Sequence, residues 1–285
     1  MGHKKILEKI KQTAEELNCD SLVLTFFPHP RMILQKNSDI KLLNTVAEKI
    51  LLFENIGIDK LIIHPFDKEF SELSAEEFVR KILVNSLNIK KIIIGHDHRF
   101  GKNRTANIYD LIFFGKKYNF EVEEITAKEI DEIAVSSTKI RNALLEGNLP
   151  LAKKYLDYNY FFSGKVVKGK QLGRTIGFPT ANIEIVEDYK LIPKNGVYIV
   201  SSSYKSVVLY GIMNIGNRPT VDGKNRTIEV HFFDFNASLY DENLTITILE
   251  RMRDEEKFQS VEALKNQLKN DKIKALAFLE KKITR

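Results

Sequence analysis

The chain has few of the features that mark secreted, membrane-spanning or metal-cluster proteins. Its 285 residues include one cysteine and no tryptophan, which excludes an internal disulfide and a cysteine metal cluster. The six histidines show no metal-ligand spacing. The longest apolar runs, such as residues 22–27, are far shorter than the roughly 20 residues that span a bilayer. The N-terminus has no secretory hydrophobic region. We therefore expect a cytoplasmic protein without a membrane partner.

Neither sign of charge is in large excess. Lysine and arginine number 44 against 38 aspartates and glutamates, a net charge of +6. This modest positive charge suits anionic ligands such as ATP. The basic residues are scattered among acidic neighbours, and no zinc-finger or basic-zipper pattern is present. We expect small anionic substrates and no nucleic-acid partner.

The first half of the chain alternates between helical and strand patterns. Apolar residues at helical spacing predict helices over residues 4–17, 46–55 and 108–118. Ser74 followed by Glu77 is the capping-box pattern that begins a further helix. Short β-rich apolar runs predict strands over residues 21–26, 60–64, 91–95 and 121–125. This alternation is typical of βαβ units and predicts an α/β domain with a parallel, doubly wound sheet.

The second half changes to a strand pattern. Turn residues separate runs that predict strands over residues 162–168, 197–202, 207–213, 228–233 and 244–249. The pattern predicts a small antiparallel barrel or a sandwich. A final helix over residues 261–279 has one apolar side, which we expect to cover the β structure. We place the domain boundary between residues 156 and 157, giving domains 1–156 and 157–285.

The densest motif lies between Gly173 and Asn182 and reads GRTIGFPTAN. Gly173 and Gly177 allow a close approach of the backbone to a ligand. Thr180 and Asn182 project from the same face if the segment is extended. Their neutral oxygens are suited to a Mg²⁺ ion that keeps most of its waters and bridges nucleotide phosphates. The alternative is a plain turn between two strands, since glycine and proline mark turns generally.

The segment from Gly164 to Ile183 resembles the signature of bacterial riboflavin kinases, which usually form the C-terminal half of bifunctional riboflavin kinase/FMN adenylyltransferases (FAD synthetases). The resemblance implies a six-stranded β-barrel with a C-terminal helix, which phosphorylates riboflavin with ATP and releases ADP. It implies that Gly173, Gly177, Thr180 and Asn182 bind ATP, and that Thr180 and Asn182 hold Mg²⁺.

Two further segments resemble the same family. The segment TIEVHFFDFNASLY begins at Thr227, and the resemblance implies that Glu229 is the catalytic base. His231 lies on the same face by the two-residue period of a strand, and we favour a packing role for it inside the barrel over one that orients Glu229. The second segment is ERMRDEEKF, from Glu250 to Phe258, and the resemblance implies that Arg253 and Phe258 contact the flavin. Asp241 stands where the family commonly has glycine, a position that tolerates aspartate if its φ is positive.

Three segments of the first half resemble the N-terminal module of these bifunctional enzymes, a Rossmann-like nucleotidyltransferase of the HxGH type. The first is TFFPHP, from which the resemblance implies that His29 contacts the flavin. The second is GHDHRFGK, which implies the same for Asp97 and Arg99. The third is VSSTKIR, in which a helix start and the side chains of Ser137, Thr138 and Arg141 are expected to meet ATP phosphates.

The chain begins Met1-Gly2-His3, where the family has a strand followed by the complete HxGH turn. Only the final Gly-His is present, so His3 is the implied ATP-binding histidine. On this interpretation the module is N-terminally incomplete. Such a module, if it is intact enough, makes FAD and pyrophosphate from FMN and ATP. The alternatives are a kinase alone with a non-catalytic N-terminal module, and a non-catalytic flavin or nucleotide sensor.

Overall fold

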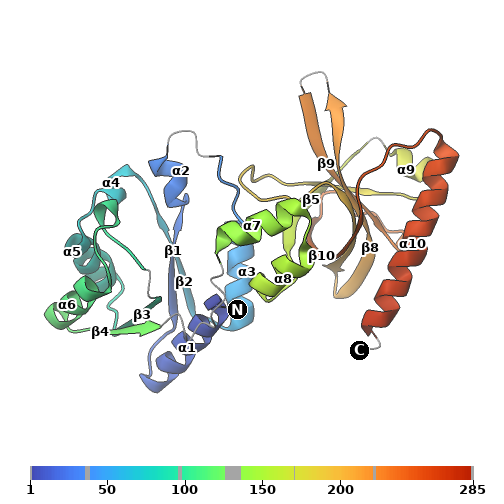
Figure 1. Ribbon diagram of the computed structural model, residues 1–285. Helices are drawn as coiled ribbons and strands as arrows, with labels where there is room; N and C mark the ends of the chain where they lie inside the picture. Colours follow the sequence, from blue (N-terminus) through green and yellow to red (C-terminus); the bar gives the residue numbers. More distant parts are fainter. Residues whose placement is uncertain are drawn as a thin grey trace. The chain divides into compact units, whose positions relative to one another are not determined.

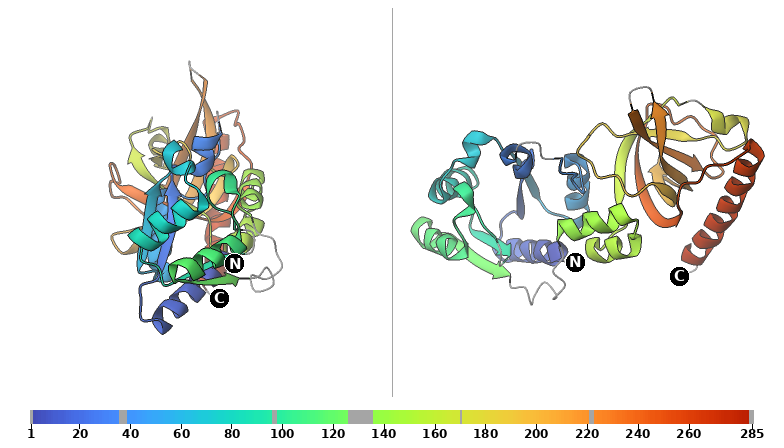
Figure 2. Two further views of the ribbon diagram at one scale, coloured as in Figure 1. Left: turned by 90° about the vertical axis from the view of Figure 1, so that its left-hand side faces the viewer. Right: turned by 45° about the horizontal axis from the view of Figure 1, so that its top comes forward.

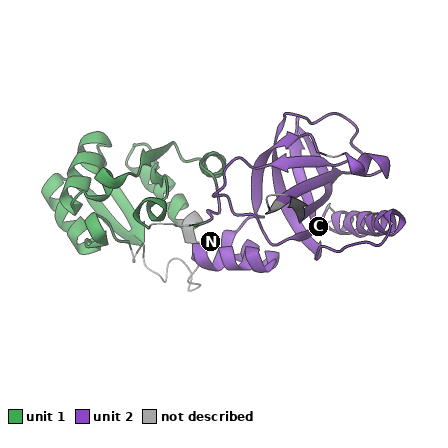
Figure 3. Ribbon diagram, turned by 90° about the horizontal axis from the view of Figure 1, so that it is seen from above, with its two compact units in different colours: residues 1–40, 45–135 green, residues 41–44, 136–285 purple. Residues whose placement is uncertain are grey.

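The computed structural model describes residues 2–35, 39–95, 98–125, 136–169, 171–220 and 223–283. The chain divides into two compact units (Figure 3). Unit 1 comprises residues 1–40 and 45–135, and unit 2 comprises residues 41–44 and 136–285. The proposed catalytic domains, 1–156 and 157–285, remain a prediction. The packing units divide earlier because residues 136–156 lie with the barrel, where the amide of Lys194 donates to the Leu144 carbonyl at 3.0 Å.

Unit 1 alternates helices with short strands (Figure 1). Its elements are α1 (Gly2–Glu16), β1 (Leu22–Phe27), α2 (Pro30–Leu34), α3 (Val46–Ile56), β2 (Lys60–Pro65), α4 (Lys68–Ser71), α5 (Ala75–Phe78), the π-helix η1 (Val79–Ser86), β3 (Lys91–Gly95), the 3₁₀-helix η2 (Lys102–Arg104), α6 (Ile108–Tyr118) and β4 (Glu121–Ile125). Ser74 and Glu77 form the predicted capping box at the start of α5. Thr45 and the fully buried Glu48 form another at α3.

The strands of unit 1 pair in parallel, as predicted, but in two separate sheets. Strand β1 pairs with β2, and β3 pairs with β4. The predicted single doubly wound sheet is therefore not continuous across the described residues. Among the described residues, no strand pairs with a member of both sheets. A buried cluster that includes Ile94, Phe100 and Leu111 is nevertheless packed against Leu24 of β1.

Unit 2 contains two helices followed by a closed barrel. Its elements are α7 (Ser137–Glu146), α8 (Leu149–Leu156), β5 (Phe161–Val167), α9 (Leu172–Thr175), β6 (Ala181–Glu184), β7 (Gly196–Tyr204), β8 (Val207–Thr220), β9 (Gly223–Phe232), β10 (Asn243–Arg253) and α10 (Val261–Ile283). The strand order is β10-β5-β6-β9-β8-β7, and every neighbouring pair is antiparallel. The six-stranded barrel with its C-terminal helix is thus confirmed, and the sandwich is excluded. The β8–β9 hairpin extends beyond the barrel (Figure 1).

Alternate residues of the barrel strands face inward and outward. Tyr198, Met213 and Val230 are register partners on adjacent strands and are completely buried, so they fill the interior. Residues of the opposite parity, such as Val197, pack instead in a cluster with Ala275 of α10. Figures 1 and 2 show α10, in red, running along the outside of the barrel. The prediction that the last helix covers the β structure is confirmed.

The short segment 41–44 belongs to unit 2 although its neighbours in sequence belong to unit 1. The ammonium group of Lys190, a residue only 3% exposed, donates to the carbonyl oxygens of Leu43 at 2.6 Å and Phe161 at 2.9 Å. The Tyr160 hydroxyl also donates to Leu43, at 2.9 Å. These buried polar groups stabilise the segment against the barrel because each donor would be costly to leave without an acceptor.

Among the described helices, none has both the length and the apolar character needed to cross a bilayer.

Candidate active site

One row of cross-strand partners brings several predicted site residues to the outer face of the barrel. Asn182 of β6 is the register partner of Glu229 on β9, and Glu229 is the partner of Asn214 on β8. The row continues through Val197 on β7 to Arg253 on β10. Directly paired residues of antiparallel strands project from the same face. Since Val197 packs against α10, the whole row lies on the outer face.

The loop before β6 places Thr180 beside the predicted base. The Thr180 hydroxyl donates to Oε2 of Glu229 at 3.3 Å. The loop folds back on itself, with the Phe178 amide donating to the Gly173 carbonyl at 2.8 Å. A Cβ at position 173 would overlap the Phe178 carbonyl oxygen, whereas Gly177 has open space but a φ of +83°. The two glycines are thus required for different reasons, one for space and one for its backbone conformation.

Asn182 is closely packed as well. A Cβ at Gly169 would overlap the side-chain amide of Asn182, so the backbone of the preceding loop approaches that amide as only glycine allows. The structure therefore brings Thr180, Asn182 and Glu229 together, and it packs the loop around them.

His231 does not fill the barrel, and that prediction was wrong. Its parity places it on the outer face with Glu229, and its Nδ1 lies 2.8 Å from the Pro179 carbonyl oxygen. Its ring makes edge-to-face contacts with Phe178 at 5.2 Å and Phe233 at 6.0 Å between centroids. Burial lowers the pKa of His231, against the opposing effect of the hydrogen bond to Pro179. The neutral imidazole is therefore favoured.

Arg253 is held by an ion pair rather than presented as a free charge. Its guanidinium donates to the carboxylate of Asp271 on α10, with Nη2 at 2.7 Å and Nε at 3.2 Å from Oδ2. Asp271 is 1% exposed, and it also accepts from Gln267 at 2.8 Å. The guanidinium lies 5.9 Å from the centroid of the Phe258 ring. The two predicted flavin-contacting residues thus lie side by side, with Arg253 anchored to α10.

Asp271 was not predicted from the sequence. It stands among lysines and asparagine in a segment that has the composition of a solvated helix face, so the sequence carried no signal of its burial. Asp241, in contrast, has the positive φ that its place in the family pattern suggested, at +66°.

The predicted adenylyltransferase residues are distributed over both units. In unit 1, Nδ1 of His29 accepts from the Arg31 amide at 3.2 Å and caps the short helix α2. Arg99 is exposed. His3 lies in α1, but its side chain is outside the described residues, and Asp97 is outside them altogether.

In unit 2, Ser137 and Thr138 occupy the first turn of α7, as predicted. The helix is capped by Ser136, whose side chain accepts from the Lys139 amide at 3.3 Å. Arg141 donates through Nε to the Lys41 carbonyl at 2.8 Å, and its Nη1 lies 3.4 Å from the Thr138 hydroxyl. Its guanidinium is therefore oriented toward the first turn of the helix.

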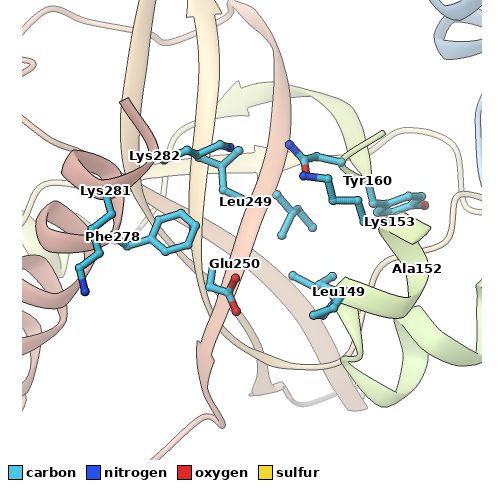
Figure 4. A pocket seen from close by; sticks show the side chains of 12 residues that line it. Leu149, Ala152, Lys153, Tyr160, Leu249, Glu250, Phe278, Lys281 and Lys282 are labelled. Carbon is cyan, nitrogen blue, oxygen red and sulfur yellow. The ribbon is translucent and has the colours of Figure 1, made fainter. Parts of the chain in front are cut away.

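A cavity of about 480 Å³ lies elsewhere on unit 2, between α8, β10 and α10 (Figure 4). Leu149, Leu249 and Phe278 form much of its apolar lining, with Lys153 and Lys282 at its edge. None of the predicted site residues lines it, so the cavity and the outer-face row are separate features.

Comparison with protein families matches both halves of the chain. A riboflavin kinase family model matches residues 156–279, and an FAD synthetase family model matches residues 1–139. A bifunctional riboflavin kinase/FMN adenylyltransferase of Buchnera aphidicola (subspecies Schizaphis graminum) is 38% identical over 275 residues, covering 95% of this chain and 88% of that protein. This chain belongs to the bifunctional riboflavin kinase/FMN adenylyltransferase family.

Other relatives agree. The Haemophilus influenzae protein of the same name is 38% identical over 98% of this chain and 90% of its own length. A crystal structure described as a macrolide-efflux protein from Streptococcus pneumoniae matches with a TM-score of 0.85 and 32% identity, covering 95% of this chain and 88% of that one. The predicted family, fold class and pair of transferase activities are confirmed, and a kinase alone is not favoured. The substrates riboflavin, FMN and ATP and the product FAD follow from the family.

Proposed function

We propose that the outer-face row of unit 2 is where riboflavin is phosphorylated, with Glu229 as the base and Thr180 and Asn182 at the metal-bound triphosphate. The observation that supports this most directly is the 3.3 Å hydrogen bond from Thr180 to Glu229. It joins the implied nucleotide loop to the implied base. Gly173 and Gly177 shape that loop so that ATP phosphates can approach its backbone.

The reaction requires little covalent chemistry from the protein. The ribityl 5′-hydroxyl gives its proton to the Glu229 carboxylate as its oxygen attacks the γ-phosphorus of ATP, and the bond from that phosphorus to ADP breaks. Rate enhancement comes mainly from positioning and from neutralising charge on the phosphoryl group. Arg253, at the end of the same row, and the neighbouring ring of Phe258 would provide a charge and an aromatic surface for the isoalloxazine.

The residues present fit a magnesium ion that arrives with the nucleotide. Thr180 and Asn182 offer neutral oxygens, and Mg²⁺ commonly takes one or two protein ligands while phosphates and waters complete its shell. The packing of the Gly169 backbone on the Asn182 amide fixes that side chain in place. When bound, the ion neutralises charge on the triphosphate.

Replacing Glu229 tests this assignment. Glu229→Gln keeps the shape of the side chain and removes the base, so we expect the kcat for FMN formation to fall by about 10²- to 10⁴-fold. Conversion of supplied FMN to FAD should continue at its normal rate. Chromatographic separation of riboflavin, FMN and FAD measures both steps in one sample. Unchanged FMN production would remove Glu229 from the mechanism.

Glu184→Gln is the matched control. Glu184 is an exposed carboxylate on β6, two residues beyond Asn182. Its replacement makes the same change of charge on the same strand pair, and we expect FMN formation to be unaffected. A loss equal to that of Glu229→Gln would mean that general charge, rather than a base, matters.

The same proposal extends to the adenylyl transfer. An FMN phosphate oxygen attacks the α-phosphorus of ATP, and the bond to pyrophosphate breaks, so no covalent enzyme intermediate is needed. Ser137, Thr138 and Arg141 at the start of α7, together with His3, would contact ATP phosphates. His29, Asp97 and Arg99 would contact the flavin. Neither nucleic acid nor a membrane is needed as a partner.

Arg141→Gln tests that assignment. We expect it to lower FAD formation from FMN by at least 10-fold, since charge-assisted bonds to phosphate contribute about 1.5–3 kcal/mol each. FMN formation from riboflavin should be unchanged. Normal FAD formation in this variant would exclude Arg141 from the adenylyltransferase site.

A further inference from the structure

Two consecutive loop residues are tied to two alternate residues of one strand. The Pro179 carbonyl lies 2.8 Å from Nδ1 of His231, and the Thr180 hydroxyl lies 3.3 Å from Oε2 of Glu229. Glu229 and His231 are two residues apart on β9 and share its outer face. These bonds attach the loop to β9 at two neighbouring points. Glu229 has an implied chemical role, and His231 has none.

The geometry determines which nitrogen of His231 carries the proton. A carbonyl oxygen only accepts hydrogen bonds, so Nδ1 must be the donor. Burial lowers the pKa of His231 and Lys272 acts in the same direction, while the bond to Pro179 and the charge of Asp234 oppose them. The net direction favours the neutral ring, in which Nε2 carries no proton. This assigns the Nδ1–H tautomer, which is set by the bond to Pro179.

Two aromatic rings pack against the imidazole. Phe178, the residue before Pro179, contacts one edge of the imidazole, and Phe233 on the same face contacts it as well. Phe233 belongs to the cluster that includes Ala275 and Leu279 of α10. The ring therefore links the helix-covered surface to the loop.

We propose that His231 is a positioning residue for the phosphoryl transfer: its Nδ1–H holds the Pro179 carbonyl and so sets Thr180 beside Glu229 for the incoming magnesium–nucleotide complex. This rests on the proposed kinase site. His231 itself touches neither the substrates nor the transferred phosphoryl group. Its effect is transmitted through one peptide unit, because Thr180 directly follows Pro179.

The first test reads the tautomer in the wild-type protein and uses a variant only to assign the signal. Long-range ¹H–¹⁵N spectra of the full-length protein with ¹⁵N-labelled histidine distinguish the two neutral tautomers, and the His231 signal is identified by its loss in His231→Asn. We expect an Nδ1–H tautomer that persists at pH 7. An Nε2–H tautomer, or a freely titrating cation at that pH, would overturn the proposal whatever the activity of the variants.

The second test compares two replacements. His231→Leu keeps bulk but removes the donor, and we expect the KM for MgATP in FMN formation to rise about 5-fold, as for the loss of one net hydrogen bond. The inhibition constant of MgADP should rise equally, while the KM for riboflavin stays constant. His231→Asn retains a side-chain N–H near the position of Nδ1 and should recover most of the loss. Equal effects on both substrates, or no rescue by asparagine, would contradict a positioning role.

Ser163→Ala is the matched control. Ser163 makes a 2.9 Å cross-strand hydrogen bond to Thr245 in the same barrel, away from the loop at residues 173–180. It should lower thermal stability without changing the KM for MgATP. If Glu229→Gln still made FMN, the proposed site would fail on that result alone. If Glu229→Gln were inactive and His231→Leu kinetically normal, only the role of His231 would fail.

Discussion

Gly173 offers the sharpest test of how tightly the nucleotide loop is folded. A Cβ at this position would overlap the carbonyl oxygen of Phe178, a backbone atom that no side-chain rotation can move. That oxygen would have to retreat by roughly 1 Å before it reached the 3.4 Å of ordinary van der Waals contact. Thr180 is only two residues further along, so the displacement reaches the group that meets Glu229.

We expect Gly173→Ala to reduce the catalytic rate strongly and the stability of the fold moderately. A misplacement of this size in a positioning element can reduce the rate by on the order of 100-fold. Strain in a closely packed loop costs about 1–3 kcal/mol. We therefore expect kcat/KM for FMN formation to fall by about 100-fold while FAD formation from FMN is unchanged. Steady-state kinetics with each flavin, together with thermal unfolding, measures all three quantities.

Gly177 supplies the control, because glycine is needed there for its backbone conformation and not for lack of space. No atom lies within 4 Å of a Cβ built there, and its φ is +83°. Asparagine tolerates this conformation better than other non-glycine residues, so Gly177→Asn should retain most of the kinase activity. If Gly173→Ala were as active as Gly177→Asn, the close approach of Gly173 to Phe178 would not be a feature of the working enzyme.

Three further results are expected. The pKa of His231 in the folded protein lies below its ordinary value of 6.5, so the unfolded chain binds more protons. The stability advantage of the wild type over His231→Asn should therefore be full above pH 6.5 and diminish as the pH falls through the folded pKa. Urea unfolding at several pH values measures this difference, and a difference that does not change with pH would contradict it. Asp271→Ala leaves Arg253 without its buried partner and should lower the free energy of unfolding by about 3 kcal/mol. Asparagine at the exposed Asp234, whose φ of +51° asparagine tolerates, should have little effect on denaturant midpoints. Asp241→Val should destabilise the barrel by about 1–2 kcal/mol because a β-branched residue is strained at positive φ, while glycine there should not, and a stable valine variant would refute this reading of the turn.

Much of the architecture could be predicted from periodicity. The helix over residues 108–118 has its predicted bounds, and so does the strand over residues 91–95, because their apolar spacing and flanking turn residues leave few alternatives. The strand over residues 223–232 was predicted to begin only at residue 228. The polar half of a hairpin that extends past the core has no apolar alternation to mark it.

The candidate site was predicted in part. Thr180 and Asn182 could be paired by their spacing, and the role of Glu229 rested on family resemblance. The face on which His231 lies could not be deduced, because period-two alternation assigns residues to a common side without saying which side is inward. That distinction depends on where α10 packs, a contact between segments about 40 residues apart in the chain.

The route of the chain through residues 41–44 affects how the two activities can be separated. Residues 41–44 lie in the sequence between parts of unit 1, yet they belong to unit 2, where the Leu43 carbonyl accepts a hydrogen bond from the buried ammonium of Lys190. A fragment that starts at residue 136 would keep every barrel strand and still lack that carbonyl. It would also lose the Leu42 backbone, which bonds to Tyr189 and Leu191. Removing the N-terminal half should therefore destabilise the kinase domain although every barrel strand is kept, which gives the fused arrangement a physical advantage over two independent proteins.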